Sequence, residues 1–565
     1  MFAPAPALAA LGLVALCLLV YLPGLTSIPP VDRDEARFAQ ASRQMIETGD
    51  FVLPRFQSSA RLQKPIGIYW LQVAAAVLTG AANGPPWATL LAFRLPSLIG
   101  AICAVLLTYV LGRRLFGATT SFLGAALLAV SALLVVAAHL ATTDAVLLAC
   151  VVVAQGCLAA AYSALRRGGR ASRAAAVGFW VALAIGFLVK GPVIALVSGV
   201  TMLSLLVADA RVTHRPLAAG VADWAASLRP AWGVPLCLAI ALPWPLVAGH
   251  DFLRESIGRD VLPKLVAGQE SHGLPPGSYL LLAAATFWPG SLVAVRGLRQ
   301  AFARRGRTAE RFCLAWLVPT WVLLELVPTK LPHYVLPLYP ALALLAARGT
   351  LDRDADTGKD PASDWKGRVA WTATRGVWLV VTGLAAIAAA GAPFALGGTP
   401  GAKLAGPATA LIVIVVAALA TRSTQCVRQA RAPWLAVVCA LLLFPPVFGW
   451  VLPAADDLWP SRAAALAVDA QASGAEVRPV AAVGYAEPSL VFLLGTRLEL
   501  DDPAGAGAFL DANPRGLVLV EETLRDQLVA AARERGLELV PLWSAHSLQY
   551  SKGRGQTLVL LERAP

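Results

Sequence analysis

Residues 32–37 read DRDEAR, which places five charged side chains in six positions. They follow residues 7–25, ALAALGLVALCLLVYLPGL, a stretch without a charged residue. A helix that crosses a bilayer needs about 20 mostly apolar residues, and residues 7–25 meet that length. Together the two stretches predict a membrane helix whose rim carries a dense group of charges, as a site of chemistry would.

The composition of the whole chain is that of a protein that crosses a membrane many times. Of its 565 residues, 57% are hydrophobic and 14% are charged, whereas a soluble domain carries about 25% charged residues. The net charge of +13 does not indicate nucleic-acid binding, because the basic residues form short clusters between apolar runs. The eight cysteines include no CxxC pair, so we expect neither a disulfide framework nor a zinc ribbon.

Apolar runs of spanning length recur along the chain, and the first lacks the basic segment and cleavage site of a signal peptide. We predict thirteen spans, near residues 6–22, 92–112, 118–138, 143–165, 174–189, 191–208, 232–248, 277–297, 311–327, 332–348, 374–396, 404–421 and 433–452. A further run, 66–82, is interpreted as an interfacial or re-entrant helix, because only then do the basic loops alternate with loops poor in lysine and arginine.

Clusters of arginine predict which loops are cytoplasmic. These clusters are Arg113 with Arg114, then Arg166, Arg167, Arg170 and Arg173, then Arg211 and Arg215, then Arg304, Arg305 and Arg307, and finally Arg422, Arg428 and Arg431. Thirteen spans then place the amino terminus inside and the carboxyl terminus outside. The chain divides into a membrane domain 1–349 with outer loops 23–91 and 250–276, a cytoplasmic linker 350–372, additional helices 373–453, and an outer α/β domain 454–565.

Carboxylates lie at two of the predicted outer corners. Asp34 and Glu35 begin a stretch with a helical rhythm, and Asp144 stands between two apolar runs. Acidic residues at a helix start also stabilise the helix, so capping is the alternative interpretation for these side chains. A carboxylate at membrane depth is costly unless it is paired or interfacial, which favours a functional role for Asp144.

Cations and one aromatic residue lie on the same predicted face. Lys64 precedes an aromatic stretch and Lys190 stands in a tight corner, where a lysine either binds an anion or snorkels to the interface. The outer loop, interpreted either as a lid or as a solvated loop, adds Arg254, Arg259, Lys264, Glu270 and His272, and segment 328–334 adds Lys330, His333 and Tyr334. Carboxylates activate hydroxyl groups and cations hold phosphates, so this rim suits a lipid-phosphate-linked donor and a polar acceptor.

Five motifs carry a resemblance to a known family. In chain order they are DRDEARFAQASRQMIETGDFVLPRF with QKPIGIYW, TTDAVLLA, GFLVKGPV, ESIGRDVLPKLVAGQESHG and TKLPHYVLPLYPALALL. They resemble the bacterial 4-amino-4-deoxy-L-arabinose lipid A transferases, which belong with the protein O-mannosyltransferases in the GT-C superfamily. The resemblance covers roughly residues 20–350.

The resemblance implies a fold and an activity. The fold would be a polytopic α-helical membrane protein of GT-C type, with about thirteen transmembrane helices and a small C-terminal periplasmic α/β domain. The activity would be transfer of a sugar from a polyprenyl phosphate to a periplasmic acceptor such as lipid A or lipopolysaccharide, at the inner membrane. The resemblance further implies Asp34 as the main catalytic carboxylate, Glu35 and Arg37 in support, Asp144 as a second acidic position, and Lys64, Lys190, Arg259, Lys264 and Tyr334 in the donor site.

Three positions depart from the family pattern. Gln63 stands where the family usually has an acid that is similar to a metal ligand, Phe38 stands where it often has tyrosine, and Ile66 replaces a proline. Whether the protein binds a divalent metal therefore stays open, with His272 and Glu270 as candidate ligands. The departures suggest a different sugar or acceptor.

Two other classes of function compete with an enzyme. A lipid or sugar transporter would need polar groups near the bilayer midplane and often has inverted halves, whereas here the charges gather at one rim. A scaffold that only presents the tail domain would leave the rim charges unexplained. The sequence does not identify the sugar, the acceptor or the stereochemical outcome.

Overall fold

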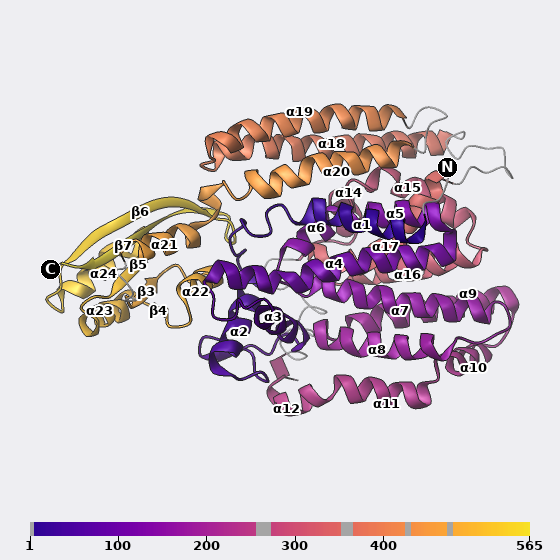
Figure 1. Cartoon of the computed structure of the whole chain (residues 1–565), viewed down its shortest axis with the longest axis horizontal. Coiled ribbons are helices and arrows are strands. Elements are labelled where there is room, and N and C mark those ends of the chain that lie inside the picture. Colours follow the sequence, from indigo (N-terminus) through magenta and orange to yellow (C-terminus); the bar gives the residue numbers. More distant parts are fainter. Residues whose placement is uncertain are drawn as a thin grey trace.

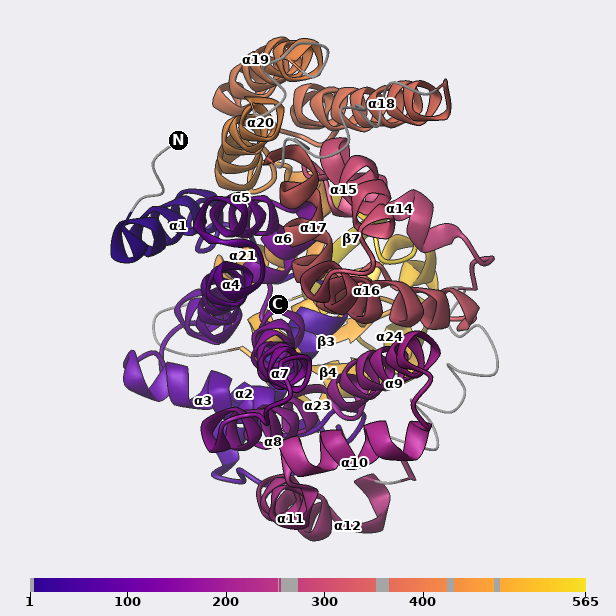
Figure 2. The same cartoon turned by 90° about the vertical axis from the view of Figure 1, so that its right-hand side faces the viewer.

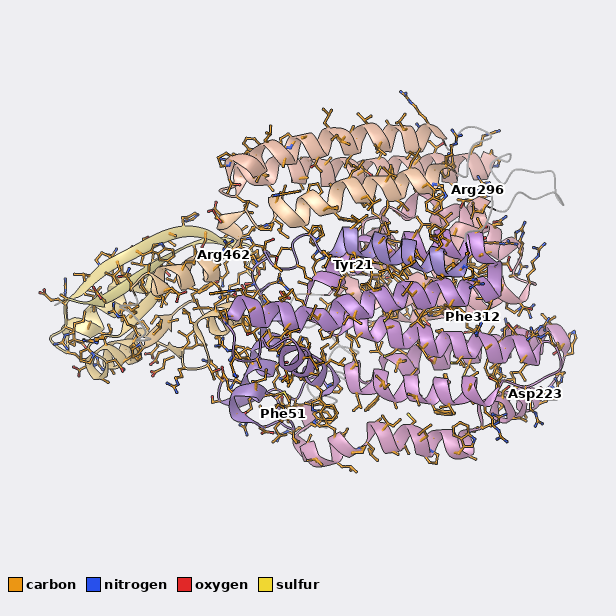
Figure 3. The ribbon with its side chains drawn as sticks, viewed as in Figure 1. Tyr21, Phe51, Asp223, Arg296, Phe312 and Arg462 are labelled. Atoms are coloured by element: carbon orange, nitrogen blue, oxygen red, sulfur yellow. The ribbon has the colours of Figure 1, made fainter. Side chains whose placement is uncertain are left out.

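The chain folds into a bundle of membrane helices and a small sheet domain at one end of it (Figure 1). The computed structural model describes residues 5–252, 254–255, 273–351, 365–423, 431–471 and 478–564. Figure 3 shows the two ends of this arrangement: Arg462 lies where the bundle meets the sheet domain, and Asp223 lies at the opposite end of the bundle.

The helical part begins with α1 and ends shortly before the sheet domain. Its elements are α1 (Pro6–Tyr21), α2 (Asp34–Thr48), β1 (Arg55–Phe56), β2 (Ser59–Ala60), α3 (Gly67–Leu78), α4 (Pro86–Phe116), α5 (Ala118–Ala129), α6 (Ala132–His139), α7 (Asp144–Leu165), α8 (Arg173–Lys190), α9 (Val193–Thr213), α10 (Leu217–Leu228), α11 (Pro230–Ala241), α12 (Pro243–Phe252), α14 (Ser278–Thr286), α15 (Ser291–Ala303), α16 (Thr308–Leu326), η2 (Pro332–Leu338), α17 (Tyr339–Leu351), α18 (Trp365–Ala395), α19 (Pro400–Ser423), α20 (Ala432–Pro446) and η4 (Val447–Val451).

Each of the thirteen predicted spans lies on one helix or on two consecutive helices. Within the described part of the chain, eight helices are long and apolar enough to cross a membrane, or up to ten if the bent pairs α5–α6 and α11–α12 each form one span. The multi-pass α-helical architecture is therefore confirmed, while the number thirteen stays a prediction. Helix α3 has 12 residues and is about 18 Å long, too short to span, as its interfacial interpretation requires.

Two features of the bundle were not predicted. Helices α18, α19 and α20 lie together along one side of the bundle (Figures 1 and 2). Helix α10 is a short element that packs against α7, α8 and α9 through Trp224 and Leu228. Its 12 residues are too few for a spanning pattern, so hydropathy alone did not indicate it.

The predicted α/β domain is confirmed. Its helices are α21 (Pro460–Asp469), α22 (Pro488–Leu494), α23 (Pro503–Ala512) and α24 (Arg525–Arg533), its short helices are η5 (Asp456–Leu458) and η6 (Glu522–Leu524), and its strands are β3 (Val480–Val483), β4 (Glu499–Asp501), β5 (Leu517–Glu521), β6 (Leu539–Gln549) and β7 (Arg554–Arg563).

The five strands form one mixed sheet in the order β4-β3-β5-β7-β6, with β3 parallel to both β4 and β5, and β7 antiparallel to both β5 and β6. Alternate residues of a strand face opposite sides of a sheet. In β5, Leu517 and Leu519 pack toward α21 and α22, whereas Val518 and Val520 pack toward α23 and α24. Helices therefore cover both faces, which explains why the strands read as continuous apolar runs.

A buried ion pair joins the segments that surround the rim. Glu35 of α2 and Arg94 of α4 are each 1% exposed, and two hydrogen bonds of 2.8 Å join the carboxylate to the guanidinium. The carboxylate also accepts the backbone N–H groups of Val31 and Ala141, at 2.9 and 2.8 Å. The guanidinium donates to three carbonyls in residues 25–29. The pair thus ties the loop after α1, α2, α4 and the corner before α7 into one unit.

We expect Arg94→Ala to destabilise the protein by about 3–5 kcal/mol, because it leaves the Glu35 carboxylate buried without its cation. The measurement is the unfolding of the full chain in detergent. The control is Glu522→Ala, which removes half of an exposed pair with Arg525 and should cost about 1 kcal/mol or less. An Arg94→Ala protein as stable as this control would contradict the assigned role of the pair.

Candidate functional site

One polar cavity of about 890 Å³ lies at the rim that the sequence singled out. Its lining comes from α2, the following loop, and the ends of α7, α8 and η2. The main polar lining residues are Asp32, Arg33, Asp34, Arg37, Arg61, Gln63, Lys64, Thr142, Thr143, Asp144, Lys190, Glu255, His333 and Tyr334. Carboxylates, cations and an aromatic ring that lie far apart in the sequence therefore meet in one space.

The structure brings together six of the residues to which the resemblance assigned a role: Asp34, Arg37, Lys64, Asp144, Lys190 and Tyr334. His333, predicted on the same rim, lines the cavity as well. Glu35 does not line the cavity, because it faces Arg94. Neighbouring residues of a helix point in different directions, so Asp34 and Glu35 do not face the same space. The remaining four candidates, Arg259, Lys264, Glu270 and His272, lie outside the described residues.

Asp144 and Lys190 form an ion pair at the cavity wall. Their side chains are 13% and 11% exposed, so both charges are largely withdrawn from water. Lys190 ends α8, and Gly191 follows it with φ 67°, a conformation that glycine adopts without strain, so the chain turns away directly after the lysine. The Lys190 ammonium also lies 6.0 Å from the centre of the Tyr334 ring. The two charges were predicted to have separate roles, whereas the structure pairs them.

Buried hydrogen bonds fix the corner that carries Asp144. The Ser97 hydroxyl donates to the carbonyl of Thr142 at 2.9 Å, and the Gln72 side-chain amide donates to the carbonyl of Ala141 at 3.0 Å. On the other side, α3 begins close to the end of α8: a Cβ on Gly67 would lie 2.7 Å from the carbonyl oxygen of Leu188. A glycine there lets the segment after Lys64 approach the helix that ends in Lys190.

Several lining residues were not assigned a role from the sequence. Asp32 and Arg33 belong to the charged stretch that drew attention, and His333 precedes Tyr334, so a signal existed for all three. Arg61 carried no such signal. Its guanidinium stacks 5.0 Å from the centre of the Phe38 ring, a contact that only the fold reveals.

The described residues do not fit a metal centre. No group of three or more His, Cys, Asp or Glu side chains placed to hold a metal occurs among them. At the position of the family's acid, the Gln63 amide donates to Glu255 at 3.2 Å. One carboxylate beside an amide lacks the three or four ligands that a zinc site uses. No chemical step is therefore derived through a metal.

The sheet domain contacts the cavity loop directly. The backbone N–H of Asp32 donates to the Tyr550 hydroxyl at 2.6 Å, and the Asp32 carboxylate accepts the N–H of Ser489 at 2.9 Å. Arg33 donates to the carbonyl of Ser551 at 3.0 Å. Arg33 has φ 69°, a conformation uncommon for residues other than glycine. These contacts hold a strained turn immediately before Asp34.

The environment of Asp32 raises its pKa. Burial raises the pKa of the Asp32 carboxyl from its ordinary 3.8 to about 6; hydrogen bonds from Ser489 oppose the rise, and repulsion from Glu487 adds to it. Glu487 itself accepts hydrogen bonds from Gln549 and Ser551 in the sheet domain. Docking of the sheet domain therefore places two carboxylates close to each other beside the cavity.

Comparisons with known proteins identify proteins to which this chain is similar. A family model described as dolichyl-phosphate-mannose-protein mannosyltransferase matches residues 63–226. An undecaprenyl phosphate-alpha-4-amino-4-deoxy-L-arabinose arabinosyl transferase from Pseudomonas fluorescens is 28% identical over 324 residues, which are 57% of this chain and 55% of that protein. One from Pseudomonas aeruginosa is 28% identical over 328 residues, with the same coverage. The match thus spans a little over half of the length of these curated relatives.

Among solved structures, ArnT from Cupriavidus metallidurans bound to undecaprenyl phosphate has a TM-score of 0.68 at 19% identity, over 97% of both chains. The chain has the fold of this ArnT structure. The archaeal oligosaccharyltransferase AglB from Archaeoglobus fulgidus has a TM-score of 0.50 at 13% identity, over 91% of this chain and 69% of AglB. The predicted resemblance and fold class are confirmed, and the ArnT likeness extends over both the bundle and the sheet domain.

We expect Asp32→Asn to change how stability depends on pH. The pKa of Asp32 in the folded protein lies above its ordinary value, so the protonated carboxyl favours the folded state. This contribution to the free energy of unfolding is full below about pH 4 and is lost as the pH rises through about 6. The neutral amide removes this loss, so Asp32→Asn should gain about 1.4 kcal/mol relative to the native chain between pH 5 and pH 8. Unfolding of both proteins at the two pH values measures it.

The matched control for that experiment is Asp511→Asn, which neutralises an exposed aspartate on α23. This variant should keep the native pH dependence. If Asp32→Asn shows the same pH dependence as the native chain, the carboxylate is not held in the buried contact described above.

Proposed function

We propose that this chain is an inner-membrane glycosyltransferase that moves a sugar from a polyprenyl-phosphate donor to an envelope acceptor such as lipid A or lipopolysaccharide. The observation that carries the proposal is the cavity, because residues from five separate segments bring carboxylates and cations to one rim. The relatives named as undecaprenyl-phosphate-dependent arabinosyl transferases support the donor class.

The donor phosphate would be bound at the cationic wall of the cavity. Lys64 and Lys190 line that wall together with Tyr334. Lysine binds phosphate as a compact charge, and the ion pair with Asp144 keeps Lys190 in place. Arg259 and Lys264, outside the described residues, are proposed as further donor ligands.

Asp34 is proposed as the general base. It would take the proton of the acceptor hydroxyl while that oxygen attacks the anomeric carbon of the sugar. The bond between the anomeric carbon and the phosphate oxygen breaks, and the polyprenyl phosphate leaves with the electron pair. Lys64 and Lys190 would stabilise the charge that grows on the leaving phosphate. Arg37 follows Asp34 by one helical turn and lines the same cavity.

Helix α7 supports a periplasmic position of the cavity. It begins at Asp144 and ends at Leu165, so its 22 residues span about 33 Å, close to the thickness of the hydrocarbon core. Arginines 166–173 follow its far end. Loops rich in arginine stay in the cytoplasm, so the end of α7 with Asp144 would lie on the periplasmic side. The amino terminus would then lie in the cytoplasm.

Gln63 is proposed as a contact of the sugar or the acceptor. Its amide oxygen is buried and has no hydrogen-bond partner within the described part of the chain. A buried hydrogen-bond acceptor without a partner destabilises the folded protein by about 1–3 kcal/mol. A hydroxyl or amine of the substrate that donates to Gln63 would remove this cost. Since Gln63 replaces the family's acid, it is a reason to expect a different substrate group at this point.

We expect Asp34→Asn to lower the rate of transfer about 10²- to 10⁴-fold while the protein stays folded, because the amide cannot accept the proton. The readout is mass spectrometry of envelope lipids and glycans from a deletion strain that expresses each variant, followed by the purified enzyme with lipid donor. Asp50→Asn, in the loop after α2, should restore the missing sugar as the native chain does. Substantial transfer by folded Asp34→Asn would overturn the assignment of the base.

We expect Lys190→Ala to weaken the binding of undecaprenyl phosphate about tenfold, because a charge-assisted contact is lost. The same substitution leaves Asp144 without its cation, so the double variant Asp144→Asn with Lys190→Ala is the control. Binding that stays weak in the double variant assigns Lys190 to the phosphate. Binding restored by Asp144→Asn would instead attribute the loss to the unpaired carboxylate and remove Lys190 from the donor site.

A further inference from the structure

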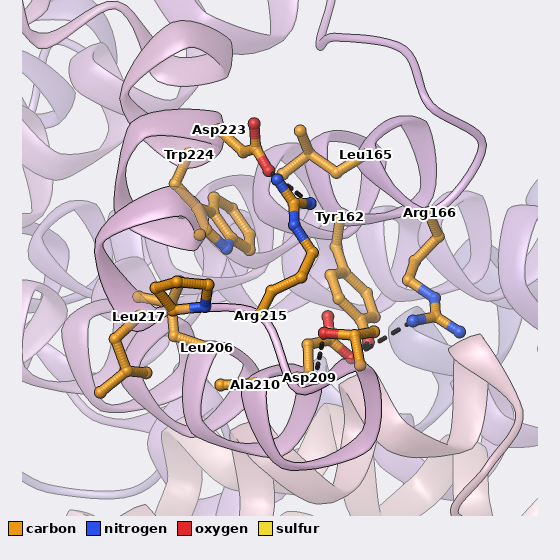
Figure 4. Close-up of a pocket in the computed structure, with 13 residues that line it drawn as sticks. Tyr162, Leu165, Arg166, Leu206, Asp209, Ala210, Arg215, Leu217, Asp223 and Trp224 are labelled. Atoms are coloured by element: carbon orange, nitrogen blue, oxygen red, sulfur yellow. Dashed lines mark hydrogen bonds and ion pairs between the residues drawn. The ribbon is translucent and has the colours of Figure 1, made fainter.

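A second polar hollow lies at the opposite end of α7 from the cavity. It has a volume of about 250 Å³ and is bounded by α7, α9 and α10 (Figure 4). Figure 4 shows Arg215 pairing with Asp223 on one side of the hollow and Arg166 pairing with Asp209 on the other. Two guanidinium groups therefore flank a space that the proposed transfer reaction does not use.

An apolar hollow of about 310 Å³ adjoins the polar one. The two share Leu206 and Trp224 as lining residues, so these two side chains lie between the polar and the apolar hollow. The apolar hollow is lined by side chains such as Phe179, Leu183 and Met202. A ligand that fills both would have an anionic end and a long apolar part.

The two arginines are held loosely enough to exchange partners. Asp209 is already satisfied by Arg311, which is 11% exposed, and by the Tyr162 hydroxyl at 3.1 Å. Arg166 reaches Asp209 only at 3.4 Å and is 33% exposed. Arg215 and Asp223 are 60% and 46% exposed. Exposed pairs of this kind contribute little to stability, so a phosphate can replace the carboxylate as the partner of either arginine.

The surroundings of the hollows are basic and interfacial. Arg167, Arg170, Arg173 and Arg211 are exposed at this end of the bundle. On α10, Leu217 and Val221 are 52% and 54% exposed, although both are apolar. A short helix with exposed apolar side chains among exposed arginines is suited to the boundary between lipid headgroups and acyl chains. Each arginine near an anionic leaflet adds to the attraction.

We propose that the two adjoining hollows bind one anionic phospholipid of the membrane face opposite the cavity. Its phosphodiester lies between Arg166 and Arg215, and one acyl chain enters the apolar hollow beside Trp224. Charge complementarity selects an anionic headgroup, and the adjoining apolar space selects a lipid over a soluble phosphate. The proposal does not depend on the transfer reaction, because no residue of the catalytic cavity takes part.

Native mass spectrometry of the full chain in detergent tests the proposal, with phosphatidylglycerol and phosphatidylcholine as probes. We expect one phosphatidylglycerol per chain to be retained at a concentration at least tenfold lower than phosphatidylcholine needs. The double variant Arg166→Gln with Arg215→Gln should weaken this retention at least tenfold. The control is the double variant Arg307→Gln with Arg422→Gln, which removes the same amount of positive charge from other positions on the same predicted face. It should change retention of phosphatidylglycerol less than twofold.

A second pair of variants tests the apolar half. A Cβ on Gly199, in the apolar hollow, and a Cβ on Gly383, in α18, would each meet no atom within 4 Å, so leucine fits at both positions. Gly199→Leu should abolish retention of phosphatidylglycerol with both arginines intact, whereas Gly383→Leu should not. This pair keeps the test valid if the arginine variants fail to fold.

Three results would overturn the proposal. The first is equal retention of phosphatidylcholine and phosphatidylglycerol by the native chain. The second is unchanged retention of phosphatidylglycerol in folded Gly199→Leu or in the arginine double variant. The third is displacement of phosphatidylglycerol by millimolar inorganic phosphate, which would identify a site for a soluble anion.

Discussion

The rim of this protein depends on the buried pair of Glu35 and Arg94. Removing a carboxylate and a guanidinium from water costs several kcal/mol for each ion, and attraction offsets that cost only when every remaining hydrogen-bonding position is used. Here the carboxylate binds two backbone N–H groups and the guanidinium binds three carbonyls in addition to the pair itself. Asp34 is adjacent to Glu35, and Asp144 follows Ala141 by three residues. The buried pair of Glu35 and Arg94 therefore positions two carboxylates of the cavity, those of Asp34 and Asp144.

The sheet domain completes the same rim from the other side. It binds the turn at Asp32 and Arg33, whose backbone conformation is unfavourable for an arginine, and it places Glu487 near Asp32. Strain of this kind persists only where the surroundings over-determine it. The sheet domain thus supplies no lining residue of the cavity but holds the turn directly before it. The proposed base, Asp34, begins the helix at this junction.

Local patterns predicted most of the fold and part of the site. Hydropathy predicted the membrane helices, and short apolar runs between helical stretches predicted β3, β5 and β7. Both signals arise within a few residues of the sequence. The corner residues Asp144 and Lys190 were found because a charge between apolar runs is conspicuous. Their pairing across 46 positions, and that of Glu35 with Arg94 across 59, depend on how helices pack and were not predicted. Glu35 was interpreted as part of the chemistry because sequence adjacency to Asp34 does not show that the two side chains point apart.

The junction between bundle and sheet domain uses main-chain atoms of the sheet domain together with the side chains of Tyr550 and Thr496. Arg33, Arg43 and Gln57 donate to the carbonyls of Ser551, Phe492 and Leu498, and the N–H of Ser489 donates to Asp32. Hydrogen bonds to main-chain atoms fix the path of the sheet-domain backbone. They restrict only weakly which side chains that backbone carries. Side chains elsewhere in the sheet domain can therefore change while its main-chain contacts to the bundle are kept. The fold is shared with ArnT over 97% of the chain, whereas sequence matches to curated relatives cover 57% of it.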